Sequence, residues 1–370
     1  MFFRARFQKR IDELLAKIDQ ANIKIKELEK QTLTAHTILN SMIEGVVILD
    51  KDVKLISCNA TAEKIFNIEQ EKVFGKFFLE AIPNNDILEL INDVLEKKQF
   101  ISKELPLIWP LVKVFHINAS PIFENDDING CLLVIHDITE LKKLENTRRD
   151  FVANVSHELR TPLTSIKGFI ETLLEGAIDD KENAKQFLTI IKEQADRFDN
   201  LINDLLALAG LESKEIKLNP RPINLKQFSH RILLDFKARL EKKNIQVINE
   251  LKEDLFVNAD KERLEQVLIN LIDNAIKFNK ESGFIKITGK EIGNKIKIII
   301  EDSGSGIPEK DIPRIFERFY RVDRARSREL GGTGLGLSIV KHIIDLHGGS
   351  VGVESTEGLG SKFYFYLPIS

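Results

Sequence analysis

Hydrophobic positions near the start of the chain recur at alternating intervals of three and four residues. They fall at residues 11, 14, 18, 21, 25 and 28, with charged residues between them. This heptad spacing is typical of a short coiled coil. It predicts a helix over residues 1–32 that pairs in parallel with a second copy of the chain. The alternative is a solitary amphipathic helix that packs on the next domain.

Short β-branched runs replace the helical spacing over residues 33–140. They cover residues 45–50, 53–59, 115–123 and 130–139, and turn-forming stretches separate them. Residues 61–66 and 85–98 keep a helical spacing, so the mixture predicts a small α+β domain. Asp137 lies three residues before Glu140, the spacing of a capping box. This spacing predicts that the last strand leads directly into the next helix.

Helical spacing returns in the middle of the chain, where we predict one helix from about 140 to 173 and a second from about 184 to 211. Two such helices bury little apolar surface alone, so a dimeric four-helix bundle is the predicted arrangement. The second helix carries an uninterrupted apolar stripe, formed by Leu188, Ile191, Ala195, Phe198, Ile202, Leu205 and Ala209.

A second α+β unit is predicted over residues 223–370, after two prolines, Pro220 and Pro222, that end the preceding helix. Its elements are a helix at 260–279, strands at 284–290 and 295–302, a helix at about 334–347, and closing strands at 350–355 and 361–368. A glycine-rich segment precedes the second of these helices.

Composition is that of a globular protein. Hydrophobic residues make up 43% and charged residues 30% of the chain, with a formal net charge of −3, so nothing indicates disorder or a nucleic-acid partner. The only cysteines, Cys58 and Cys131, lie in apolar runs. We therefore predict two small buried residues in a reducing compartment rather than a disulfide or a metal site.

The first residues bear on localisation. No apolar run approaches the roughly 20 residues that span a bilayer, and the start lacks the apolar core of a signal peptide. These features favour a cytoplasmic chain. Phe2 and Phe3 beside Arg4 and Arg6 leave two alternatives open, which are peripheral attachment at the inner face of a membrane and a soluble fragment of a membrane protein.

The segment SHELRTPL, residues 156–163, places His157 on the polar side of the first middle helix. The apolar stripe of that helix runs through residues 152, 155, 159, 166 and 170, and His157 lies about 160° from its centre. A packed histidine is thus disfavoured. A metal site is disfavoured too, because Thr161 stands one turn further on where a ligand would be expected. An exposed imidazole that acts as a base or nucleophile remains.

Two neighbours of His157 have predicted roles. Glu158 is expected to accept the imidazole Nδ1 proton, which leaves the Nε2 lone pair free to attack. Thr161, four residues on, shares the face of His157 and is expected to orient a water. The alternative for each is a solvated helix surface.

Asn270, Asn274 and Lys277 are spaced i, i+4 and i+7, which places them on one face of the predicted 260–279 helix. Amide oxygens suit Mg²⁺, and a lysine suits phosphate. The alternative is that the asparagines make structural hydrogen bonds.

Two glycine-rich segments follow. Asp302 precedes Gly304 and Gly306, an arrangement in which backbone approaches a flat ligand while the carboxylate accepts a hydrogen bond from an amino group. Glycines 332, 334 and 336 open the next helix, where N–H groups can point at phosphate oxygens. The second segment fits neither a Walker motif nor a dinucleotide fingerprint. Between them, residues 308–330 are rich in Arg and Glu and carry FERFYR. We predict a mobile lid, too polar to be buried.

These features resemble known families. The order of elements over residues 33–140 resembles a PAS sensor domain. SHELRTPL resembles the phosphoacceptor box of sensor histidine kinases, and the asparagine, glycine and phenylalanine segments resemble the boxes of the GHKL ATP-binding fold. The resemblance to PAS-containing, phosphate-regulon-type kinases covers residues 33–370. It implies a multidomain α and α+β chain, with an N-terminal helix or coiled coil (1–32), a PAS domain (33–140), a dimeric phosphotransfer hairpin (141–215) and a GHKL α/β-sandwich domain (223–370).

The resemblance also implies an activity. A kinase of this type phosphorylates His157 from Mg·ATP, with Glu158 as general base, and passes the phosphoryl group to an aspartate in the receiver of a response regulator. Thr161 would align water for the reverse phosphatase reaction. The implied enzyme is an ATP:protein-L-histidine phosphotransferase that acts as a homodimer and does not bind nucleic acid directly.

The implied cofactors are ATP and Mg²⁺, with Asn274 as metal ligand and Asp302 as adenine reader. Many relatives carry a tyrosine where this chain has Phe278, which can stack on the base but cannot donate a hydroxyl hydrogen bond. The implied nucleotide-binding residues are Asn270, Asn274, Lys277, Phe278, Asp302, Gly304, Gly306, Gly332, Thr333, Gly334, Leu335 and Gly336.

Two other functions compete with the kinase. A GHKL ATPase that drives a conformational cycle shares the glycine segments but has no use for an exposed HELRTP. A sensory protein whose kinase has decayed is disfavoured because every expected polar position is occupied. In the sensor domain, Trp109, Cys58, His116 and His136 raise flavin or haem as an alternative, but core or surface roles are favoured.

Overall fold

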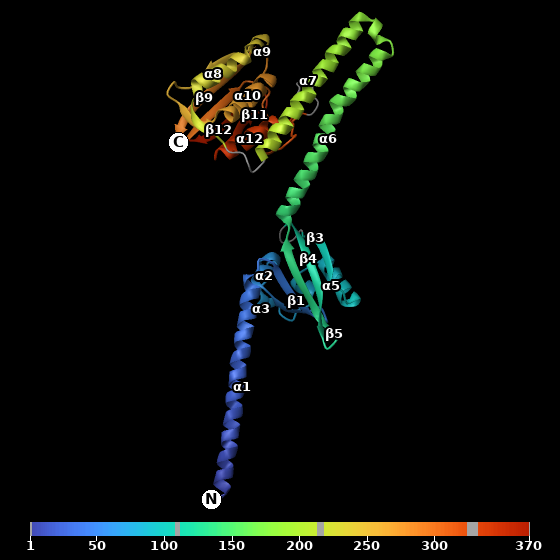
Figure 1. The fold of residues 1–370 in the computed structure, drawn as a ribbon, viewed down its shortest axis with the longest axis vertical. Coiled ribbons are helices and arrows are strands. Elements are labelled where there is room, and N and C mark those ends of the chain that lie inside the picture. Colours follow the sequence, from blue (N-terminus) through green and yellow to red (C-terminus); the bar gives the residue numbers. More distant parts are fainter. Residues whose placement is uncertain (1, 108–111, 213–217, 324–331, 370) are drawn as a thin grey trace. The chain divides into compact units, whose positions relative to one another are not determined.

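The computed structural model describes residues 2–107, 112–212, 218–323 and 332–369. They form two compact units, residues 1–149 and 150–370, which are considered separately (Figure 1). Trp109 and the lid residues 324–330 lie outside the described ranges, as do the side chains of Ile11 and Leu14. No helix in the described ranges is long and apolar enough to cross a membrane.

The first unit begins with helix α1, Phe2–Ser41, which is longer than the predicted 1–32. Its large apolar side chains between residues 15 and 38 are exposed. The buried amide of Asn59 holds its carboxyl end: Nδ2 donates to the carbonyl oxygens of Leu39 (2.9 Å) and Glu44 (2.8 Å), and Oδ1 accepts from the N–H groups of Val46 and Ala62. One side chain thus joins α1, the first strand and the next helix.

A five-stranded antiparallel sheet follows, in the order β2-β1-β5-β4-β3. The side chains of α5 (Asn85–Lys97) fill its core with those of the central strands, and the α+β class predicted here is confirmed. The strands are β1 (Gly45–Asp50), β2 (Leu55–Cys58), β3 (Ile101–Leu107), β4 (Lys113–Glu124) and β5 (Asp127–Asp137), and the short helices are α2 (Ala60–Phe66), α3 (Gln70–Val73) and α4 (Phe78–Ala81).

Strand β3 was not predicted from the sequence. Its residues, ISKELPL, include two charged side chains and Pro106, and four of the seven positions are exposed. It lies at the sheet edge, where proline and exposed charge are tolerated. Cys58 and Cys131 are both buried, as predicted, and burial raises the pKa of each thiol to about 11.

The capping box predicted at Asp137 and Glu140 is wrong. Helix α6 (Thr139–Leu174) begins after Ile138, and Asp137 Oδ1 instead accepts from the N–H (3.0 Å) and hydroxyl (2.6 Å) of Thr139. Its other oxygen accepts from Lys113 Nζ on β4 at 2.8 Å. Burial opposes ionisation, but these hydrogen bonds lower the pKa of Asp137 to about 2. Strand β5 still leads directly into the helix, through a turn that Asp137 ties to β4.

Helices α6 and α7 (Lys181–Glu212) form an antiparallel hairpin through the short helix η1 (Ala177–Asp179) (Figure 1). The rings of Phe169 and Phe187 pack across it at 5.4 Å. Helix α7 starts three residues earlier than predicted, because Asp180 Oδ1 accepts from the N–H groups of Glu182 and Asn183 and so caps it.

The C-terminal part, residues 218–323 and 332–369, contains a sheet of order β11-β12-β10-β9-β7 and a separate β6-β8 pair. Helices α8, α10 and α12 share one apolar core with the sheet. The bounds are β6 (Pro220–Asn224), α8 (Leu225–Asp235), α9 (Lys237–Lys242), β7 (Gln246–Asn249), β8 (Phe256–Asp260), α10 (Lys261–Lys277), β9 (Phe284–Ile292), β10 (Lys295–Asp302), η2 (Glu309–Arg314), α12 (Gly336–Leu346), β11 (Ser350–Thr356) and β12 (Gly360–Pro368).

The end of α7 joins this core. Leu201, Leu208 and Leu211 are almost completely buried in it, and the carbonyl of Leu211 lies 3.0 Å from His342 Nε2 of α12. None of these three leucines belongs to the apolar stripe predicted from the sequence. One residue of that stripe, Leu205, also packs against the same core. Helix α7 therefore has two apolar faces, and one of them packs against the C-terminal part.

Candidate functional site

Helix α10 presents the predicted asparagine and lysine side chains on its polar face. Asp260 caps its start by accepting from the N–H groups of Glu262 and Arg263. Seven apolar residues of the helix are buried in the core. Asn270, Asn274 and Lys277 lie on another face and are half-buried. The i, i+4, i+7 spacing thus gives one polar row along the helix.

The other end of α10 is fixed by Lys243, whose Nζ donates to the carbonyl oxygens of Ile276 (2.8 Å) and Lys277 (3.1 Å). A cation at the carboxyl end of a helix satisfies free carbonyl groups and the helix dipole. Phe278, the next residue, is consequently held at the edge of the polar row. This lysine was not singled out from the sequence.

Asp302 is buried because of its register in β10. Side chains alternate along this strand, so that Ile296, Ile298, Ile300 and Asp302 all face the core. Burial raises the pKa of Asp302 to about 6, against the hydrogen bonds from the backbone N–H groups of Gly304 (2.8 Å) and Ser361. A buried carboxylate at the end of a strand can accept a hydrogen bond from a ligand amino group.

The glycines allow close approach of separate segments. A Cβ at Gly304 would collide with the carbonyl of Phe278, and one at Gly336 would lie 3.1 Å from Asn270 Oδ1. Gly306 and Gly334 have φ of +67° and +76°, which favour glycine. The first glycine segment thereby packs at the carboxyl end of α10 and the second packs near its middle, so the three predicted segments come together in space.

Together these segments enclose a cavity of about 990 Å³, large enough for a nucleotide. Gly304 and Leu335 lie behind the residues that form its wall, and Leu335 is fully buried in the core. The predicted residues that line the cavity are Asn270, Asn274, Lys277, Phe278, Asp302, Gly306, Gly332, Thr333, Gly334 and Gly336.

The first part of the predicted lid is anchored on the second glycine segment. Phe319 has φ +61° and its N–H donates to the carbonyl of Gly334 at 2.9 Å, and Tyr320 donates its hydroxyl hydrogen to Asp311 at 2.7 Å. The prediction that the lid is too polar to be buried is wrong at Arg321. Only 5% of its side chain is exposed, because it extends into the cavity wall and ends on α6.

His157 is exposed on α6, on the polar side that its helical phase predicts. The Thr161 hydroxyl donates to the backbone carbonyl of His157 at 3.0 Å. Glu158 does not take the predicted hydrogen bond from His157, since neighbouring residues of a helix point about 100° apart. Its Oε2 instead accepts from Arg321 (2.9 Å) and Arg197 of α7 (3.3 Å).

Helix α7 forms a wall of the cavity that the sequence analysis missed. Arg197 and Asp204 line it, and Asp204 Oδ2 accepts a hydrogen bond from the Thr333 hydroxyl at 2.6 Å. A signal was present: positions 197, 201, 204, 208 and 211 follow a four-three repeat that mixes buried leucines with these two charged residues.

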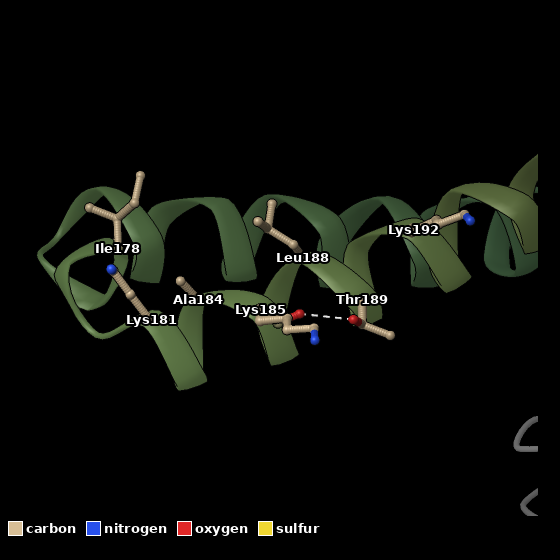
Figure 2. Close-up of a pocket in the computed structure, with 7 residues that line it drawn as sticks. All are labelled: Ile178, Lys181, Ala184, Lys185, Leu188, Thr189 and Lys192. Carbon is tan, nitrogen blue, oxygen red and sulfur yellow. Dashed lines mark hydrogen bonds between the residues drawn. The ribbon is translucent and has the colours of Figure 1, made fainter.

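A second hollow, of about 580 Å³, lies at the turn of the hairpin and contains none of the predicted site residues. Figure 2 shows Ile178 and Leu188 projecting to the same side there. Both are more than half exposed. The rest of its lining is three lysines with one alanine and one threonine: Lys181, Lys185, Lys192, Ala184 and Thr189. This hollow is an open apolar and basic surface rather than an enclosed site.

The described residues contain no cluster of three histidine, cysteine or carboxylate side chains that would hold a metal by themselves. A Mg²⁺ that accompanies a nucleotide needs fewer protein ligands, because phosphates and waters complete its shell. In the first unit, His116 Nε2 lies 2.8 Å from Ser102 Oγ and His136 Nδ1 lies 3.7 Å from Glu44. These contacts are the surface roles favoured for the two histidines.

Three protein-family models match the chain. Residues 39–143 match the PAS fold, and residues 147–214 match the His Kinase A (phospho-acceptor) domain. Residues 259–370 match the histidine kinase-, DNA gyrase B- and HSP90-like ATPase. Only the middle match separates a kinase from the other ATPases that share the third domain, and it contains His157.

Individual relatives agree with these matches. The chain is 36% identical to a sensor histidine kinase, WalK, of Bacillus subtilis over 90% of its own length and 54% of that protein. It is 34% identical to a sensor protein kinase, WalK, of Staphylococcus aureus over 97% of its length and 87% of that protein. It thus spans little more than half of some relatives. A solved complex of histidine kinase ThkA with response regulator protein TrrA is 31% identical, with a TM-score of 0.51 over 90% of this chain and 98% of the kinase.

Proposed function

This chain belongs to the sensor histidine kinases, and from that premise we propose that it transfers the γ-phosphoryl group of ATP to His157 and from there to a response regulator. One observation carries the proposal. An exposed histidine on a phosphoacceptor helix and a nucleotide-sized cavity with a polar row, a buried carboxylate and two glycine segments occur in the same compact unit.

The nucleotide orientation follows from the chemistry of the walls. Asp302 accepts from the exocyclic amino group of adenine, and Phe278 stacks on the ring. Lys277, Thr333 and the N–H groups of residues 332–336 hold the phosphates near the start of α12. The purine therefore lies beside the end of β10 and the phosphates lie near the start of α12, so the C-terminal part is the catalytic part of the kinase.

Phosphoryl transfer then needs few groups. The Nε2 lone pair of His157 attacks the γ-phosphorus, a P–N bond forms, the bond to the β-phosphate oxygen breaks and ADP leaves. Glu158 removes the imidazole proton as the bond forms. Because Glu158 accepts from Arg321 and Arg197 here, it must exchange these contacts for His157 before it acts as base. Positioning supplies most of the rate.

The residues present fit a Mg²⁺ held mainly by the nucleotide. The amide of Asn274 lies in the cavity wall beside Asn270, whereas the nearby carboxylate of Asp273 is paired with Lys277 at 2.7 Å and Arg239 at 2.6 Å. Asn274 would therefore ligate it. When bound, the ion neutralises phosphate charge.

We propose an aspartate of a response-regulator receiver as the acceptor of the phosphoryl group. The solved ThkA complex, which contains a response regulator, supports this choice. The reverse activity, hydrolysis of the regulator's phosphoaspartate, is assigned to a water aligned by Thr161, whose side chain shares the exposed face of His157. Use of ATP and two buried free thiols favour the cytoplasm as the location.

The proposed active form is a homodimer. Several large apolar side chains of the hairpin are exposed in a single chain, among them Leu163, Leu174, Leu188 and Leu206. Pairing two hairpins as a four-helix bundle would cover such side chains. The exposed apolar positions of α1 support parallel pairing of that helix as well.

Incubation with γ-labelled ATP tests the proposal. The wild-type chain should acquire an acid-labile, alkali-stable label, which is the stability of a phosphohistidine, and His157→Gln should acquire none. His230→Gln is the matched control, because His230 is an exposed histidine of α8 outside the cavity. Label that persists in His157→Gln would contradict the proposal. ATP hydrolysis without label would favour an ATPase instead.

A further inference from the structure

Asp204 is a charged residue on the face of α7 that meets the catalytic part. Leu201 precedes it by three residues and Leu208 follows it by four, and both are at least 97% buried. A leucine at position 204 would continue this apolar face without placing a charge on it. Burial of a carboxylate is unfavourable unless it gains compensating hydrogen bonds or charges. The half-buried carboxylate of Asp204 is therefore stabilised by the groups that it contacts.

Those contacts are groups that we assign to nucleotide phosphates. Oδ2 accepts from the hydroxyl of Thr333, which lies between Gly332 and Gly334 at the start of α12, at 2.6 Å. The same hydroxyl accepts from the N–H of Leu335 at 3.2 Å. Lys277 is close enough for its charge to favour the carboxylate.

The charge balance around Asp204 agrees with a site built for an anion. Burial raises its pKa above the usual value, and the Thr333 hydrogen bond and Lys277 act in the opposite direction, while Asp273 disfavours a second negative charge. Asp273 is itself neutralised by Lys277 and Arg239. A nucleotide phosphate would gain the same hydroxyl and lysine contacts.

We propose that the Asp204 carboxylate occupies a phosphate position of the nucleotide site and competes there with ATP. The inference rests on the proposed nucleotide site and adds its regulation. The phosphates must displace Asp204 from Thr333, which separates α7 from the start of α12. The two equilibria are linked: a signal that holds α7 against the catalytic part weakens ATP binding by the same factor by which bound ATP weakens that contact.

Glu158 extends this arrangement to α6. Its carboxylate accepts from Arg321, which lines the same cavity. Two carboxylates of the hairpin thus engage groups of the nucleotide site, and the conformation that buries Asp204 also keeps Glu158 away from His157. Binding of ATP and release of the base are thereby coupled.

The test is calorimetric titration of the full chain with AMPPNP, ADP and adenosine, each in the presence and in the absence of Mg²⁺. Asp204→Asn keeps the size and removes the charge, so its affinity for AMPPNP and ADP should rise about three- to tenfold. Its affinity for adenosine, which has no phosphates, should not change. Asp199→Asn is the control, because Asp199 is an exposed acid of the same helix outside the cavity and should leave all three affinities unchanged.

Unchanged AMPPNP affinity in Asp204→Asn would overturn the inference, and so would weaker binding that appears only with Mg²⁺, since that would make Asp204 a metal ligand. Wild-type protein that binds no AMPPNP would contradict the proposed function instead. A second measurement on chains with native Asp204 uses spin labels at the exposed polar positions Asn203 of α7 and Lys341 of α12. Saturating AMPPNP should lengthen their separation and adenosine should not; no change with AMPPNP would also overturn the inference.

Discussion

Glu158 accepts hydrogen bonds from two arginines that come from different elements, Arg197 of α7 and Arg321 of the lid. Its carboxylate is 17% exposed and both guanidinium groups are less so. A carboxylate held in this way is kept away from His157. At the scale of single residues, therefore, the proposed general base is present, but its carboxylate is bound to two arginines rather than to His157.

Glu158 and Thr161 should separate two reactions. We expect Glu158→Gln to slow autophosphorylation by about a hundredfold, because an amide cannot take the imidazole proton. Thr161→Ala should leave autophosphorylation within about twofold and slow dephosphorylation of the regulator by about tenfold or more. The measurements are label uptake from γ-labelled ATP and loss of label from a purified phosphorylated regulator. Equal damage to both reactions by both substitutions would show that the division of roles is wrong.

Asp302 should make nucleotide binding depend on pH. Its pKa of about 6 means that the carboxyl is mostly protonated at pH 5.5 and ionised at pH 7.5, and only the ionised form is a full acceptor for adenine. From that titration, AMPPNP affinity should fall about fourfold between pH 7.5 and 5.5. Asp302→Asn should lose this component and keep only the titration of the nucleotide phosphates, which both proteins share. The same slope in both proteins would exclude Asp302 as its source.

The same residue affects stability with a definite sign. Because the pKa of Asp302 is raised in the folded state, its contribution to stability is fully present below the unfolded value of 3.8 and is lost as the pH rises through about 6. Above pH 6 the nucleotide-free domain therefore holds an unfavourable buried charge. Ligand binding relieves it by supplying a donor.

At the scale of elements, the hydrophobic pattern of α7 predicted the helix but not which of its faces lines the cavity. The stripe predicted from Leu188 to Ala209 indicates a helix, and α7 is one. A second stripe through Leu201, Leu208 and Leu211 was overlooked because two charged residues interrupt it. Those charges line the cavity, so the break in the pattern marked the functional face.

Two further predictions from the sequence missed or misassigned an element, again because its environment was not visible in the local pattern. Strand β3 has no apolar alternation, because an edge strand is half solvated. The capping box at Asp137 and Glu140 matched in spacing, but Lys113 of β4 and the nearer Thr139 take the aspartate oxygens. A local motif predicts only what its own residues can do, and here a residue 24 positions away competes successfully.

At the scale of the whole molecule, the exposed apolar face of the hairpin predicts association. Leu174→Glu should convert a dimer to monomer in light scattering coupled to size exclusion, because it places a charge where two hairpins would pack. Leu359→Glu is a matched control. Leu174 is 77% exposed and Leu359, in the catalytic part, is 75% exposed, so the two substitutions differ in location rather than in burial within one chain.

Two outcomes would count against that arrangement. A wild-type chain that is monomeric at micromolar concentration would contradict the homodimer. A dimer that survives Leu174→Glu but is lost in Leu359→Glu would place the interface on the catalytic part.

Sequence alone determined the local chemistry of this protein. Helical phase put His157 toward solvent, and the i, i+4, i+7 spacing put Asn270, Asn274 and Lys277 in one row, because both follow from the geometry of a single helix. The glycine segments likewise predicted a close approach of backbone to a ligand, and in the structure Gly304 and Gly306 also lie against backbone carbonyl groups. The family resemblance that rests on these residues is confirmed by the matching domains and relatives.

Only the tertiary structure decided which of these groups meet. The contacts Glu158 to Arg321 and Asp204 to Thr333 join residues 163 and 129 positions apart. No periodicity reports such pairs, because they depend on how the hairpin packs against the catalytic part rather than on the geometry of either alone. The same packing half-buries Asp204 and raises the pKa of its carboxyl, whereas Asp302 is buried by its register within the sheet. The identity of the chemical groups thus follows from local sequence, whereas the contacts that regulate them depend on burial and on residues far apart in the chain.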